Sequence, residues 1–372
     1  MENMPKTSAK PLYLQLSDNL RERIRQGEWQ VGERLPSFTE IQKEHGAAIA
    51  TIQKVYDVLE REGLIERRAR SGIYVSNPAP AQTGLLAYVV PDEGDPSHYA
   101  TSSYSMRLLH GAHREIAQRG YQLVLCTPRQ LRTNPYPISG CIVQGDLRLV
   151  QECAAFGIPM VTLVSEQTGI PCVGTDEFAG FKTITRHVLQ MGHRRIAALI
   201  GSSDTYGKFD MINPLRVEGY LAALAEQNIE APKSWVRRVR KIDSDFTYAN
   251  WRHWSYQEMR RWIREDWEEL GCTAIVTQND STAIGVIEAL RRHGYRVPQD
   301  VSVTGYDASG EDANFNLKLT TMRVPLEEIA HKAVELLDGK LTGSLCGTEK
   351  VNLPIQLVAG ESAVQLEGGE SA

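Results

Sequence analysis

From Leu85 onward, short apolar runs alternate with amphipathic stretches, and this alternation constrains the fold more than any other feature of the sequence. A run that is apolar on both faces is typical of a buried strand in a parallel sheet with helices on each side. The runs that predict such strands are residues 85–90, 122–125, 141–143, 160–163, 196–200, 274–277 and 301–306. Because seven strands exceed what one open sheet of ordinary size requires, we expect an α/β body of two lobes, each built on a doubly wound parallel sheet.

The first 75 residues have a different, helical pattern. Apolar residues recur at helical spacing from Tyr13 onward, and Ser37 can cap a second helix that ends near Gly46. A third helix is predicted over residues 48–62, followed by a strand, a basic turn and a second strand that ends at Val75. Three helices and a two-stranded wing predict a winged helix-turn-helix domain.

The composition excludes some classes of protein but does not identify the function. Hydrophobic residues make up 42% of the 372 residues, as in an ordinary folded protein, and residues 1–80 carry 12 Lys and Arg against 11 Asp and Glu. Total charge therefore does not by itself identify a DNA-binding segment. No apolar run approaches the ~18 residues of a membrane span and the N-terminus has no apolar signal segment, so we expect a cytoplasmic protein without a membrane partner. Six scattered cysteines without a C-x-x-C pair indicate neither a disulfide framework nor a cysteine zinc site. We also expect no metal and no cofactor.

Several motifs in the N-terminal domain resemble the GntR type of DNA-binding domain. They are residues 11–16, 27–37, 59–65 and 72–75, and the match covers almost all of residues 11–75. The resemblance implies double-stranded DNA as a partner, with helix side chains in the groove and wing arginines on the backbone or in the minor groove. The DNA-binding residues expected on this basis are Ser37, Thr39, Ala48, Thr51, Gln53, Lys54, Arg67, Arg68, Arg70 and Gly72.

Two positions depart from that family's pattern. The family usually presents arginine where this chain has Thr39 and Ile49, and each lost charge contact weakens binding and flattens its salt dependence. We therefore expect DNA binding that relies on dimerisation and on a narrower set of contacts. A solvated basic turn stays open as the alternative for the wing arginines, and a protein-interaction module as the alternative for the whole domain.

Blocks of the body resemble the ligand-binding part of LacI-type regulators, namely residues 173–176, 187–197, 278–285, 297–307 and 319–325. The resemblance implies a two-lobed, periplasmic-binding-protein-like domain that takes a small-molecule effector between its lobes and forms a homodimer. A GntR-type head on such a body is similar to the chimeric regulators of the arabinose-repressor kind.

The predicted domains follow from these two resemblances. They are a head at 1–75, a linker at 76–84, an effector-binding and dimerisation body at 85–365 and a tail at 366–372. Within the body we expect lobe 1 at about 85–163 and 321–341, and lobe 2 at about 164–319 and 342–365.

The effector contacts that the resemblance carries over are polar or aromatic: Tyr104, Ser105, Arg216, Phe246, Asn279 and Asp307. Arg and Asp can hold neighbouring hydroxyls by charge-assisted hydrogen bonds, Asn offers a donor and an acceptor, and an aromatic face can stack on a ring. This set suits a sugar or a nucleoside-like effector. Alternatives stay open, with Asp307 as a cap, Arg216 in an ion pair within one lobe, and the tryptophans between 251 and 267 as core packing.

Other segments depart from the LacI pattern or exclude a function. Residues 126–137 are too short and proline-rich for the usual crossover helix, and the linker at 76–84 stands where that family has a hinge helix. Residues 201–209 place five residues instead of four between the glycines of a P-loop and end on Phe209, so we expect no nucleotide site and no enzyme. The sequence therefore predicts a ligand-responsive DNA-binding transcriptional regulator, a repressor. The alternative is a small-molecule-binding sensor whose DNA-binding head is weakened or lost.

Overall fold

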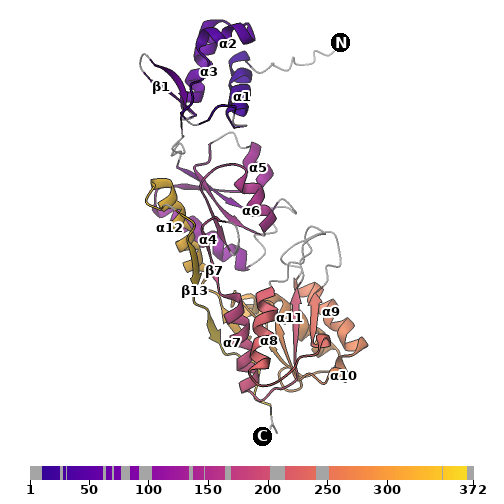
Figure 1. Ribbon diagram of the computed structural model, residues 1–372. Helices are drawn as coiled ribbons and strands as arrows, with labels where there is room; N and C mark the ends of the chain where they lie inside the picture. Colours follow the sequence, from indigo (N-terminus) through magenta and orange to yellow (C-terminus); the bar gives the residue numbers. More distant parts are fainter. Residues whose placement is uncertain are drawn as a thin grey trace, which may run out of the picture. The chain divides into compact units, whose positions relative to one another are not determined.

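The computed structural model describes residues 11–25, 28–30, 32–61, 64–68, 71–76, 84–91, 103–133, 137–145, 147–163, 169–201, 214–239, 251–345 and 347–366 (Figure 1). Two predicted site residues, Arg70 and Phe246, lie outside these ranges, as does most of the predicted linker. The chain divides into two compact units, residues 1–85 with 134–140 and residues 86–133 with 141–372. Each is described by itself.

The first unit contains the winged helix-turn-helix that the sequence predicts. Its elements are α1 (Leu12–Arg25), α2 (Phe38–His45), α3 (Ile49–Arg61), β1 (Ile65–Arg68) and β2 (Gly72–Val75). The two strands pair antiparallel, with Ile65 opposite Val75. Leu20, Ile41 and Ile52 are buried in a core that all three helices share. Arg67 and Arg68 lie inside β1, so the basic segment of the wing is partly strand where the sequence predicts a turn.

The first lobe of the second unit is built on a six-stranded sheet in the order β13-β7-β6-β5-β3-β4. Its strands are β3 (Leu85–Val89), β4 (Gln122–Cys126), β5 (Gly140–Gln144), β6 (Met160–Leu163), β7 (Cys172–Thr175) and β13 (Lys350–Leu353). Its helices are α4 (Ser103–Gln118), α5 (Pro128–Thr133), α6 (Leu147–Ala154) and α12 (Leu326–Thr342). The pairs β5 with β6, β6 with β7 and β7 with β13 are parallel. The apolar runs predict β5 and β6, whereas β7 and β13 lie outside the predicted runs.

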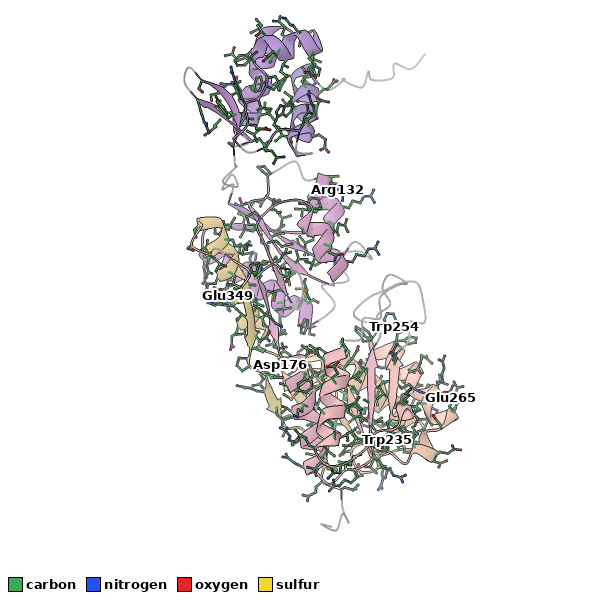
Figure 2. All side chains as sticks on the ribbon, viewed as in Figure 1. Arg132, Asp176, Trp235, Trp254, Glu265 and Glu349 are labelled. Atoms are coloured by element: carbon green, nitrogen blue, oxygen red, sulfur yellow. The ribbon has the colours of Figure 1, made fainter. Side chains whose placement is uncertain are left out.

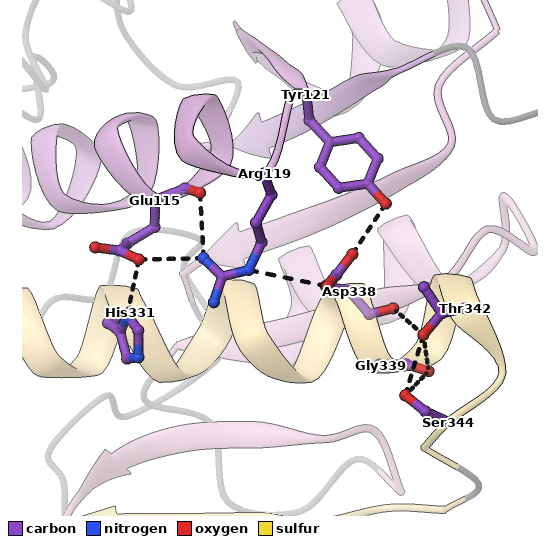
Figure 3. Close-up of polar contacts among 8 residues, drawn as sticks. All are labelled: Glu115, Arg119, Tyr121, His331, Asp338, Gly339, Thr342 and Ser344. Carbon is purple, nitrogen blue, oxygen red and sulfur yellow. Dashed lines mark hydrogen bonds and ion pairs between the residues drawn. The ribbon is translucent and has the colours of Figure 1, made fainter.

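A polar network joins α4 to α12 (Figure 3). The Glu115 carboxylate, 8% exposed, lies 2.8 Å from His331 Nδ1 and 3.1 Å from Arg119 Nη1. Tyr121 donates to Asp338 at 2.9 Å. The contacts with His331 and Arg119 hold the pKa of Glu115 below its ordinary value, chiefly through the hydrogen bond with His331. A buried carboxylate is tolerated here because several donors surround it.

The second lobe is built on a parallel four-stranded sheet in the order β11-β10-β8-β9. Its strands are β8 (Ile196–Gly201), β9 (Val236–Val239), β10 (Ala274–Thr277) and β11 (Ser302–Thr304). Its helices are α7 (Glu177–Gln190), α8 (Pro214–Ala225), α9 (Trp251–Glu265), α10 (Trp267–Leu270) and α11 (Asp280–Arg292). Residues 233–235 and 311–314 form 3₁₀ turns, and β12 (Thr321–Arg323) pairs antiparallel with β14 (Gln356–Val358).

Alternating residues of β8 face two different hydrophobic cores. Ile196 and Ala198 join the core that contains residues of α7 and α8, whereas Ala197 and Leu199 join the core of α9 and α11. Helices therefore cover both faces of the sheet (Figure 1). The tryptophans of α9 and α10 belong to the second core, Trp254 among them (Figure 2), which confirms core packing as their role.

Two expectations about the body are wrong. Cys172–Thr175 and Lys350–Leu353 are strands of the first-lobe sheet, although the sequence assigns both segments to lobe 2. The predicted lobe boundaries fail because strand pairing between distant segments decides lobe membership. Residues 128–133 do form a helix, because Pro128 stands in the first turn, where a missing N–H costs nothing, and the Thr127 hydroxyl accepts from Gln130 N.

Within the described ranges, no helix is long and apolar enough to cross a membrane. The same part of the chain holds no cluster of three or more His, Cys, Asp or Glu side chains arranged as metal ligands. Five cysteines, Cys126, Cys141, Cys153, Cys172 and Cys272, are free and buried.

Candidate functional site: DNA interface and effector cluster

Ser37 fixes the start of α2. Its hydroxyl accepts from Glu40 N at 3.4 Å, and the Glu40 carboxylate accepts from Ser37 N at 2.6 Å, which together form a capping box. Hydrogen bonds from Ser37 lower the pKa of Glu40. The Thr39 hydroxyl lies 3.1 Å from the Ser37 hydroxyl, and Thr39 is exposed. Ser37 therefore holds the helix start, and its contact with DNA stays a prediction.

Helix α3 exposes one face and buries the other. Ile52, Val55 and Tyr56 are buried, and the Tyr56 hydroxyl donates to Pro36 O at 2.5 Å, so α3 is fixed against the start of α2. Of the predicted DNA-binding residues in this segment, Ala48 just before the helix is exposed, as are Gln53 and Lys54 on it, whereas Thr51 is half-buried. Contact between these residues and DNA stays a prediction.

The wing arginines are ion-paired within the head. Arg67 lies 2.5 Å from Asp57 and 3.2 Å from Glu60, both on α3, and Arg68 lies 2.6 Å from Glu66. Arg68 also stacks over the Tyr74 ring at 4.4 Å. Both arginines are exposed and lie in a strand, so a solvated basic segment stays open as the alternative for them. Any DNA contact they make must compete with carboxylates that already hold them.

The wing needs a residue without a Cβ at position 72. Its φ of +130° is rarely adopted by residues with a side chain, and a Cβ here would stand 2.7 Å from Arg34 Nε. Arg34 bridges to Tyr74 in the wing and forms no ion pair with any described carboxylate. Arg34 is a candidate cation that sequence reasoning missed, although it precedes Leu35-Pro36-Ser37 in the matched motif.

Arg216 is the centre of the cluster that the sequence predicts to bind the effector. Its side chain, 20% exposed, donates from Nε to Glu177 at 2.5 Å and from Nη1 to Gln278 O at 2.5 Å. The guanidinium also lies over the rings of Tyr306 and Phe181, at 4.7 and 5.2 Å. The ion pair that the sequence left open is therefore present, and its partner Glu177 was not foreseen.

The surroundings of Arg216 keep it charged. Burial acts to lower the pKa of Arg216, but Glu177, Tyr306 and Asp307 together raise it above its ordinary value. Burial raises the pKa of the Tyr306 hydroxyl, so Tyr306 stays neutral at physiological pH. Arg216 Nη2 has no hydrogen-bond partner among the described residues, so its two N–H donors are unused there.

Asn279 and Asp307 follow the carboxyl ends of β10 and β11. The Asn279 side-chain oxygen accepts from Thr282 N at 2.9 Å and caps α11, which leaves the amide nitrogen without a partner in the described part of the chain. Asp307 and Ala308 have φ values of 102° and 47°, and Asp307 is held by backbone hydrogen bonds with Met322 and Val324. Two adjacent left-handed residues that are not glycine store strain, a pattern that clusters at functional sites.

The first-lobe residues lie on α4 in different environments. Ser105 is buried and its hydroxyl accepts from Gln144, which in turn accepts from Tyr88, whereas Tyr104 is half-buried. Further along the helix, Arg107 donates to Ala308 O at 3.0 Å and forms two 2.9 Å hydrogen bonds with Glu327. Arg107 thus fixes the loop that carries Asp307, a role that helical spacing alone could not show.

Comparison with known proteins agrees with both units. Residues 12–75 match the gntR family of bacterial regulatory proteins, and residues 185–363 match the periplasmic binding protein-like domain. The chain belongs to the helix-turn-helix transcriptional regulators, with a GntR-type head on a LacI-type body.

Three similar proteins illustrate this membership. An HTH-type transcriptional regulator in the aml 5′ region of Streptomyces limosus is 30% identical over 77% of this chain and 81% of its own length. The arabinose metabolism transcriptional repressor of Geobacillus stearothermophilus is 26% identical over 88% of this chain and 90% of its own. The solved transcriptional regulator CelR–cellobiose complex, 22% identical, covers 87% of this chain and 93% of its own, with a TM-score of 0.65, and shows the same fold.

Proposed function

We propose that the protein is a repressor whose affinity for double-stranded DNA is set by a sugar bound at the cluster of Arg216, Asn279 and Asp307. The observation that carries the proposal is the set of unused donors beside a carboxylate: Arg216 Nη2 and the Asn279 amide nitrogen, with Asp307 close enough to affect the pKa of Arg216. Hydroxyl-rich ligands match donors and acceptors of this kind. The names of the relatives, which refer to arabinose and cellobiose, support a sugar.

The ligand acts by shifting an equilibrium between two states of the body. It can change DNA affinity only by its own difference in affinity for those states. Because Arg107 of α4 hydrogen-bonds the loop that carries Asp307, a ligand bound at the cluster can change the position of the first lobe. The LacI-type body supports a homodimer. The protein would act in the cytoplasm.

The ligand proposal is tested by thermal denaturation of the full chain with arabinose, ribose and cellobiose, each in large excess. A sugar at about 100 times its dissociation constant stabilises the body by about 2.7 kcal/mol, which is readily measured. Asp307→Asn should remove most of this stabilisation. Asp300→Asn, which alters a half-buried aspartate bound to Arg296, is the matched control and should retain it. No shift with any sugar refutes the sugar, and an unchanged shift in Asp307→Asn refutes the site.

A second function, a sensor without DNA binding, is favoured by the ion-paired wing arginines and by the uncharged Thr39 and Ile49. A gel shift of the full chain on its own upstream DNA at low salt distinguishes the two functions. Specific retardation that a sugar alters supports the repressor. Retardation that is equal for unrelated DNA, with or without the sugar, supports the sensor.

A further inference from the structure

The exposed start of α3 is apolar. Ala48, Ile49 and Ala50 are all exposed, and the Ile49 side chain is 49% exposed, whereas Ile52 one turn later is fully buried. The Ile49 side chain cannot hydrogen-bond to water, and the rest of the head does not cover it. Gln53 follows Ile49 by one helical turn and is exposed as well, so the two share a face.

The charges around this start favour a polyanion. Each described carboxylate of α2 and α3 is engaged within the head, with Glu40 in the capping box, Glu44 on Arg23, and Asp57 and Glu60 on Arg67. By contrast, Lys43, Lys54 and Arg34 form no ion pair with any described residue, and both lysines are exposed. An apolar start among free cations fits a partner that presents phosphates around a groove with apolar groups inside it.

We propose that Ile49 reads thymine. In the major groove the only apolar group that a base pair presents is the thymine C5-methyl, and aliphatic side chains recognise it by contact. Gln53, one turn further on, has the donor and acceptor that match adenine N7 and N6. The DNA half-site, meaning the part of the site that one head contacts, therefore carries a thymine opposite Ile49 and an adenine opposite Gln53. This inference rests on DNA binding by the head, as proposed above, and adds which bases the head selects.

The test uses the full chain and duplexes enriched by it from a random library. The enriched half-sites should share at least one thymine whose replacement by uracil, which removes only the methyl group, weakens binding about fourfold. In Ile49→Ala that thymine and uracil should bind equally. Gln53→Ala should lose discrimination at a neighbouring adenine, by about 5- to 150-fold.

Lys54→Ala is the matched control on the same helix. It should weaken binding to all duplexes alike and reduce the salt slope by about one, yet keep the difference between thymine and uracil. Equal binding of thymine and uracil at every position by the unaltered protein overturns the proposal, as does an unchanged difference in Ile49→Ala. If no duplex is enriched, DNA binding by the head fails and this inference fails with it. If duplexes are enriched without methyl sensitivity, only the role of Ile49 fails.

Discussion

Arg216→Ala should destabilise the body in the absence of any ligand, because it leaves Glu177 buried and unpaired. Glu177 is 7% exposed and Arg216 is 20% exposed, so this pair is far less screened than a surface pair. Removing one partner of a buried ion pair costs about 3–5 kcal/mol. The Thr175 hydroxyl still donates to Glu177 at 3.0 Å, which favours the lower end, about 3 kcal/mol. At about 2–4 °C per kcal/mol, the melting temperature should fall by about 6–12 °C.

Thermal and denaturant unfolding of the unliganded protein at pH 7.5 measure this loss. The double variant Arg216→Met with Glu177→Gln removes both charges and should recover at least half of the lost stability, since the penalty lies in the isolated carboxylate. Arg186→Ala breaks an exposed pair with Glu226 and is the control, in which little change is expected.

The reasoning is refuted if Arg216→Ala lies within about 1 kcal/mol of the unaltered protein at pH 7.5, or if the double variant is as unstable as the single one.

Three further outcomes are expected. Ser37→Ala removes the capping box of α2 and should destabilise the head by about 1 kcal/mol in denaturant unfolding, whereas Ser37→Asp, which can cap, should not. Gly72→Ala forces a Cβ toward Arg34 at a strained φ and should cost about 1–3 kcal/mol; unchanged unfolding of the head would contradict the described wing. Glu115→Gln should lower the stability of the body at pH 7. The pKa of Glu115 is lower in the folded protein than its unfolded value near 4.5, so the ionised carboxylate stabilises the fold at any pH above 4.5. The difference between the variant and the unaltered protein should disappear as the pH falls below 4.5 and Glu115, beside His331, is protonated. A pH-independent difference would contradict that account.

Local signals predict much of the fold. The Ser37 capping position, the end of α2 at Gly46 and the apolar face of α3 all depend on residues within a few positions of one another, so the sequence predicts the head almost element by element. Each of the seven apolar runs contains a strand, and six of these strands are largely buried on both faces, which leaves a local pattern, whereas β4 is only partly buried. Resemblance to known families then directed attention to Arg216, Asn279 and Asp307, whose surroundings suit a binding role.

The tertiary structure decided what depends on contacts between distant segments. Cys172–Thr175 joins the first-lobe sheet because it pairs with β6 and β13, and no local pattern indicates which sheet a buried strand will enter. Arg216 forms an ion pair with Glu177, which lies 39 residues earlier in the chain. Arg67 forms an ion pair with Asp57 of α3. The sequence by itself determined the elements of the head, the seven strand runs and the types of side chain at the site, because periodicity and capping act over a few residues. Their partners were decided only by folding, because strand pairing and ion pairing join groups that the chain order does not bring together.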